Sequence, residues 1–113
     1  MLEKTGVSMG EVDQVEVLKF NHQCMTVANI FPKVEINEAF AAQALSCQKA
    51  LDIPLEKFNT CGGAVALGHP LAASGSRISA HLVHKLRRNG EKYGIGSACI
   101  GGGQGIAILF ERV

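Results

Sequence analysis

GGAVALGHPLAASG, residues 62–75, is a glycine-bracketed loop that places a single histidine, His69, directly before a predicted helix. Gly68 gives the backbone on one side of His69 conformational freedom, and Pro70 restricts the backbone on the other side. We therefore expect the loop to fix the direction in which the imidazole points. Histidine titrates near neutral pH, which makes His69 a candidate acid or base; alternatively, it merely caps the following helix.

The segment after this loop, Ser74–Asn89, has the periodicity of an amphipathic helix. Ile78, Leu82 and Leu86 recur at a spacing of four residues and predict one buried face. Gly90 follows as a stop signal, and basic residues gather near this end, where they complement the helix dipole. We expect the polar residues His81, His84 and Lys85 to face solvent or to serve packing, and we assign them no chemistry.

Further along the chain, Cys99 precedes a second glycine-rich run, Gly101-Gly102-Gly103-Gln104-Gly105. Probable strands at Tyr93–Ala98 and Ile106–Phe110 flank this stretch, so the thiol is expected where a strand opens into a glycine turn. Such a turn allows backbone N–H groups to converge on a ligand. A plain hairpin with a structural cysteine would produce the same pattern.

Upstream, Asn37–Leu51 reads as an amphipathic helix with Asn37 as its N-cap. Short strands are predicted at Val12–Val17 and Phe58–Cys61, and Met1–Lys4 resembles the last turn of a helix. Strands that alternate with helices and end in a hairpin predict an α/β fold, with a mixed sheet and flanking helices.

The composition of the 113 residues is that of a globular chain, with 47% hydrophobic and 19% charged residues. The net charge of +1 gives no reason to expect nucleic acid, and no apolar run is long enough for a membrane span. The four cysteines fit neither a disulfide framework nor a zinc site, which favours a reducing compartment. The acidic residues near the N-terminus do not suit a mitochondrial presequence.

Three motifs together, Asn37-Glu38-Ala39-Phe40-Ala41, the His69 loop and the Cys99 stretch, resemble the thiolases in their order and spacing. The likeness runs from about Glu35 to Phe110 and is closest to the C-terminal part of a 3-ketoacyl-CoA thiolase of the mitochondrial type. It implies that residues 1–113 form an incomplete thiolase-like α/β domain.

Residues 17–33 have no counterpart in the family pattern. Val15-Glu16 recurs as Val34-Glu35, and deletion of one copy with the residues between them restores the expected strand into Asn37. Two explanations stay open, a retained in-frame intron and a genuine surface insertion. Either way, we expect this segment to lie outside the core.

The resemblance implies CoA-dependent thiolytic cleavage of a 3-ketoacyl-CoA in fatty acid β-oxidation. His69 would activate a cysteine nucleophile, and Cys99 would carry protons to and from carbon or the CoA sulfur. Gly101 would offer its backbone N–H to the acyl oxyanion, and Asn37 would hold a water for the other oxyanion. We expect His69 and Cys99 to meet across one pocket.

The resemblance implies that the nucleophilic cysteine lies in the N-terminal half of full-length thiolases. No stretch of these 113 residues matches the motif around that cysteine. We therefore expect no thiolysis from these 113 residues alone. Alternatives are an acetyl-CoA acetyltransferase working in the condensing direction and a non-catalytic module that binds acyl-CoA or a partner. A nucleotide-binding loop is the weakest interpretation, because the glycine run leads into a strand.

The resemblance further implies acyl-CoA and CoA as ligands, no metal or redox cofactor and a homo-oligomeric assembly. It also implies a mitochondrial location, with peroxisomal or cytosolic locations as alternatives.

Overall fold

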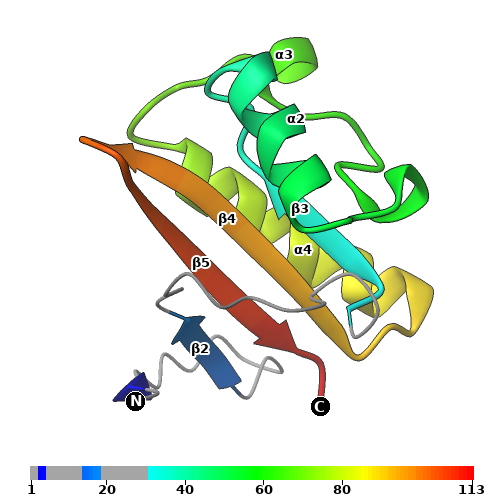
Figure 1. Cartoon of the computed structure of the whole chain (residues 1–113). Coiled ribbons are helices and arrows are strands. Elements are labelled where there is room, and N and C mark those ends of the chain that lie inside the picture. Colours follow the sequence, from blue (N-terminus) through cyan, green and yellow to red (C-terminus); the bar gives the residue numbers. More distant parts are fainter. Residues whose placement is uncertain (1–2, 5–13, 19–30) are drawn as a thin grey trace.

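A computed structural model of the chain describes residues 3–4, 14–18 and 31–113 (Figure 1). These residues contain one five-stranded mixed sheet with the strand order β1-β2-β5-β4-β3. Its strands are β1 (Glu3–Lys4), β2 (Gln14–Leu18), β3 (Lys33–Ile36), β4 (Tyr93–Gly101) and β5 (Gln104–Glu111). The β3–β4 pair is parallel, whereas the other neighbouring strands pair antiparallel. The predicted α/β fold with a mixed sheet and flanking helices is confirmed.

Helix α4 (Ser74–Asn89) has the bounds that the sequence predicted. It ends because Gly90 takes a left-handed conformation, with φ of 67°. The next backbone N–H, that of Glu91, donates to the Leu86 carbonyl at 3.0 Å and satisfies one of the last carbonyl groups of the helix. The other helical segments are α2 (Ala41–Ala50), the 3₁₀ turn η1 (Leu55–Lys57) and α3 (Ala64–Leu67).

One face of the sheet packs against α4. Ile78, Leu82 and Leu86 of the helix form a buried cluster with Phe110 of β5. The helix approaches β4 at Gly96, where an added Cβ would lie 2.8 Å from the Ile78 side chain. The glycine thus permits close packing between α4 and the middle of β4.

The opposite face of β3 carries a second core of Val34 and Ile36 packed with Ile53. Cys47 and Leu51, in and directly after α2, pack against this cluster. Between Val34 and Ile36, Glu35 contacts residues of α4 instead. Because side chains alternate between the faces of a strand, the sheet separates α2 from α4 (Figure 1).

The β4–β5 hairpin turns at Gly102 and Gly103, which have φ values of 58° and 74°. Two positive φ angles are the requirement of a type I′ turn, which glycine meets without strain. Strand β4 continues to Gly101, beyond the predicted end at Ala98. Cys99 therefore belongs to the strand, next to an irregularity in the pairing between Cys99 and Gly101.

Several local predictions near the N-terminus were wrong. Glu3–Lys4, expected to be a helix tail, pairs with β2 as a strand. The segment 17–33, expected outside the core, contributes to the sheet at both ends, since Val17 and Leu18 pair with β5 and Lys33 begins β3. Phe31 also packs against the Val34 cluster. Residues 19–30 of that segment lie outside the described residues.

The strand predicted at Phe58–Cys61 reduces to a single bridge between Val34 and Phe58.

Candidate active site

Asn37 lies directly after β3 at the carboxyl end of the parallel strand pair. Its backbone N–H donates to the Ser97 carbonyl at 2.8 Å, which extends the ladder by one step beyond the strand. Asn37 is not an N-cap as predicted: α2 begins four residues later, and its cap position is Phe40. The asparagine side chain is only 1% exposed, and its Oδ1 atom has no hydrogen-bond partner among the described residues. A buried carbonyl oxygen of this kind is suited to accept a hydrogen bond from a ligand or from water.

The structure brings His69 to Asn37. The Asn37 Nδ2 atom lies 3.3 Å from His69 Nε2 and 3.5 Å from His69 Nδ1. A donor that lay along the lone-pair direction of one ring nitrogen would be much farther from the second ring nitrogen. The two nearly equal distances therefore show that the amide approaches the ring from the side. This contact therefore leaves the lone-pair direction of Nε2 open.

Ser74, the first residue of α4, holds the other side of the imidazole. Its Oγ atom lies 2.6 Å from His69 Nδ1 and donates to the Pro70 carbonyl at 3.2 Å. The hydroxyl has one hydrogen, so when it donates to Pro70 its oxygen accepts from Nδ1–H. In that tautomer of His69, Nε2 is the basic nitrogen. Ser74 was not among the site residues predicted from the sequence.

Cys99 and Gly101 lie at the same end of the sheet as Asn37, the carboxyl end of the β3–β4 pair. Ile36 pairs with Ser97, so the end of β3 lies two residues from Cys99 along β4. The Cys99 side chain is exposed. No hydrogen bond within residues 31–113 joins Cys99 to His69, so a shared pocket for these two side chains stays a prediction.

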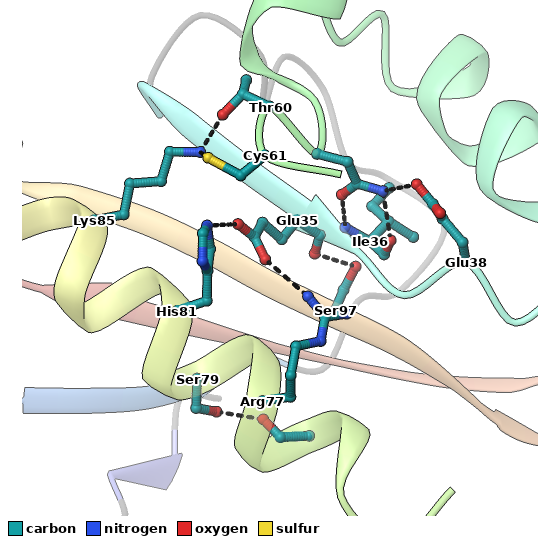
Figure 2. A network of polar contacts seen from close by, with 12 residues as sticks. Glu35, Ile36, Glu38, Thr60, Cys61, Arg77, Ser79, His81, Lys85 and Ser97 are labelled. Carbon is teal, nitrogen blue, oxygen red and sulfur yellow. Dashed lines mark hydrogen bonds and ion pairs between the residues drawn. The ribbon is translucent and has the colours of Figure 1, made fainter. Parts of the chain in front are cut away.

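A second polar cluster lies between β3 and α4, centred on Glu35, and Figure 2 shows it from close by. Glu35 is 3% exposed. Its carboxylate oxygens lie 2.9 Å from His81 Nε2 and 3.8 Å from an Arg77 guanidinium nitrogen. Lys85, one turn along, donates to Thr60 and lies 3.4 Å from the Cys61 sulfur. The sequence assigned His81 and Lys85 no partner, although Arg77, His81 and Lys85 recur at a spacing of four residues.

Burial raises the pKa of Glu35 from 4.5 to about 7, and the positive charges of Lys85 and Arg77 oppose part of this rise. Burial also lowers the pKa of His81, with the same two cations and Arg88 and His84 adding to the effect. Below pH 7 the Glu35 carboxyl is thus mainly protonated. Glu35 Oε1 and His81 Nε2 lie 2.9 Å apart, within ion-pair distance, but their geometry is not that of a hydrogen bond.

This shift predicts a pH-dependent stability. A carboxyl whose pKa is raised on folding stabilises the folded state fully below its unfolded value of 4.5, and this stabilisation is lost as pH rises through about 7. Glu35→Gln removes the titration. We expect the wild-type free energy of unfolding to fall relative to that of Glu35→Gln by about 2–3 kcal/mol between pH 4.5 and 8.

Urea unfolding at several pH values measures this difference. The His81 contribution has the opposite sign, but it is present in both proteins and cancels to a first approximation. Parallel pH curves for the two proteins would show that Glu35 does not titrate in this range.

Within the described residues, no group of three or more His, Cys, Asp or Glu side chains is placed to hold a metal ion. None of the helices in the same part of the chain has the length and apolar character needed to cross a bilayer.

Comparison with known proteins identifies the family of this chain. Residues 18–112 match the family "Thiolase, C-terminal domain". The chain is 54% identical over 111 residues to the bovine (Bos taurus) protein "3-ketoacyl-CoA thiolase, mitochondrial", covering 98% of this chain and 23% of the relative. It therefore spans about a quarter of that relative's length.

Two solved structures share the fold. The human mitochondrial 3-ketoacyl-CoA thiolase in complex with CoA matches with a TM-score of 0.72 and 60% identity, covering 74% of this chain and 21% of that protein. The Bacillus anthracis acetyl-CoA acetyltransferase matches with a TM-score of 0.71 and 48% identity over the same shares of both chains. Together with these similarities, the match of residues 18–112 to the thiolase C-terminal domain shows that the chain belongs to the thiolase family.

Proposed function

We propose that this chain supplies the C-terminal part of the active site of a 3-ketoacyl-CoA thiolase, which cleaves a 3-ketoacyl-CoA with CoA to give an acyl-CoA and acetyl-CoA. One observation carries the proposal: His69 and the buried Asn37 are in contact at the sheet edge that also bears Cys99. The likeness to a human relative solved with CoA supports the same choice of ligand.

The proposed reaction begins with a cysteine thiol from the N-terminal half of the enzyme. His69 Nε2 takes the proton of that thiol, and the sulfur attacks the ketone carbon of the substrate. The bond between this carbon and the neighbouring CH₂ group then breaks, and its electron pair leaves with acetyl-CoA as a carbanion. Cys99 donates the proton that neutralises this carbanion.

In the second half of the reaction, the CoA thiol attacks the acyl-enzyme, and the cysteine sulfur leaves and takes its proton back from His69. Cys99 takes the proton from the CoA sulfur as the new thioester forms, which returns it to its starting state. The backbone N–H of Gly101 stabilises the acyl oxyanion. The unpartnered Oδ1 of Asn37 would accept a hydrogen bond from a water, and this water would donate to the other thioester oxygen.

We propose that the reaction needs no metal or redox cofactor, since each step is a proton or acyl transfer and CoA enters as a substrate. A mitochondrial location and a homo-oligomeric assembly complete the proposal. The location is supported by the names of the bovine and human relatives.

A second candidate is the acetyltransfer reaction in the condensing direction. The 48% identity to the Bacillus anthracis acetyl-CoA acetyltransferase favours it. Chain-length preference separates the two activities: cleavage of long-chain 3-ketoacyl-CoA supports the first, whereas activity confined to four-carbon substrates supports the second.

A hybrid thiolase tests the proposed function directly. In it, the complete 113-residue chain replaces the matched C-terminal segment of the bovine relative. We expect CoA-dependent loss of a 3-ketoacyl-CoA by the hybrid and none by the 113-residue chain alone, which offers a base without the nucleophile. A hybrid that folds and binds CoA without turnover would contradict the proposal and favour a non-catalytic binding module.

A further inference from the structure

Asn59 connects two parts of the fold. It links the loop that precedes His69 with the open edge of β3. Its side chain brackets Ile36, since Oδ1 accepts from the Ile36 N–H and Nδ2 donates to the Ile36 carbonyl, both at 2.9 Å. Its backbone N–H also donates to the Val34 carbonyl at 3.0 Å. Because β3 is the last strand of the sheet, Asn59 satisfies backbone groups that a neighbouring strand would otherwise pair.

Glu38, the residue after Asn37, extends this set of hydrogen bonds (Figure 2). Its carboxylate accepts from Asn59 Nδ2 at 2.7 Å and from the Val65 backbone N–H at 2.9 Å. The carboxylate also lies tightly against Gly63, where an added Cβ would come within 2.2 Å of the Glu38 carboxyl carbon. The Gly63 position therefore accommodates only glycine while Glu38 keeps this place.

These contacts determine where the two site residues lie relative to each other. Glu38 follows Asn37 directly in the chain, and Val65 belongs to α3, which ends two residues before His69. The contact between Asn37 and His69 is long and lies off the direction of either ring nitrogen. It is too weak to set its own geometry, whereas a carboxylate that accepts two short hydrogen bonds is a strong and directional anchor.

We propose that Glu38 and Asn59 are positioning residues that hold the His69 loop against Asn37. The inference rests on the proposed function in that the positioned histidine is the base of the thiolase reaction. Neither residue contacts the reacting atoms in this scheme; both act through His69.

Glu38→Gln in the hybrid thiolase is the test. Glutamine keeps the shape of glutamate but offers one acceptor atom, so its NH₂ group must oppose either Asn59 Nδ2 or the Val65 N–H. We expect kcat to fall about tenfold to a hundredfold, as is typical when a catalytic group is misplaced by about 1 Å, while KM changes little. The matched control is Glu56→Gln, an exposed position in η1, which should keep the wild-type kcat.

Two further measurements separate positioning from a general structural role. In a His69→Ala background, Glu38→Gln should cause little additional loss, because its effect passes through the histidine; an undiminished loss would overturn the proposal. Hydrogen exchange of the hybrid should also show faster exchange at the Val65 to His69 amides in Glu38→Gln, while the amides of β5 keep their rates.

The exchange measurement does not depend on turnover. An inactive wild-type hybrid would count against the proposed function, and the exchange rates would still decide whether Glu38 holds the loop. Unchanged exchange at Val65 to His69 would overturn the inference in either case. A loop that loosens in an active hybrid without any change in kcat would also overturn it.

Discussion

His69→Ala in the hybrid thiolase is expected to lower kcat by about 10²- to 10⁴-fold, the contribution of a positioned general base. Ser74 contacts the imidazole at Nδ1, and the side-on contact of Asn37 leaves the lone-pair direction of Nε2 open. Alanine removes the group that accepts the proton of the nucleophile. Binding of CoA should weaken much less, because the loss concerns a proton transfer in the reaction.

His84→Ala is the matched control for this prediction. His84 lies on the exposed side of α4, in the same part of the fold but away from the sheet edge. The rate of this variant should equal that of the unmodified hybrid. A His69→Ala hybrid that retains its kcat within about threefold would show that the histidine is structural, as in the alternative interpretation of its loop.

Leu82→Ala should cause the largest loss of stability. Leu82 is 0% exposed and lies at the centre of the cluster between α4 and the sheet, with Ile78, Leu86 and Phe110 around it. Truncation removes three carbon atoms from this cluster and leaves a cavity beside Gly96. Substitutions of this kind cost about 2–5 kcal/mol, a large part of the free energy of unfolding of a small domain.

Urea unfolding of the 113-residue chain measures this cost. Leu45→Ala is a suitable control, since Leu45 lies on α2 and is 56% exposed. It should change the free energy of unfolding by less than about 0.5 kcal/mol. A Leu82→Ala loss below about 1 kcal/mol would show that α4 does not pack on the sheet in this way.

The sequence predicted α4 to the residue because every signal for this helix is local. Apolar residues recur at the helical spacing, and Gly90 provides the left-handed stop. The start of α2 was wrong for the opposite reason. Asn37 has the chemistry of an N-cap, but its backbone is taken by the parallel ladder to Ser97, which no local pattern reveals.

The N-terminal errors have the same origin. Glu3–Lys4 pairs with β2, and β2 pairs with β5 at the other end of the chain. Such long-range pairing overrides the local preference of a two-residue segment. The predicted end of β4 was too early because glycine locally favours a turn, whereas Cys99 and Gly101 still pair with β5.

The same contrast between local signals and long-range contacts applies to the candidate site. His69 was identified from its glycine-bracketed loop, and the family resemblance supplied the roles of Asn37, Cys99 and Gly101. The contacts of Glu35 with His81 and of Glu38 with Asn59 could not be read from the sequence. Both depend on the register by which β3 meets α4 and the loop before α3, and glutamate at these positions is equally compatible with a solvated surface.

The central claim is that His69, Asn37 and Cys99 act on one thioester at the carboxyl end of the β3–β4 pair. A crystal structure of the hybrid thiolase with an acyl-CoA bound tests it most directly. We predict that His69 Nε2 and Cys99 Sγ both lie within about 4 Å of the thioester group, the range of direct contact. A structure in which the two side chains lie on opposite faces of the sheet, with the thioester reached by only one of them, would contradict the account.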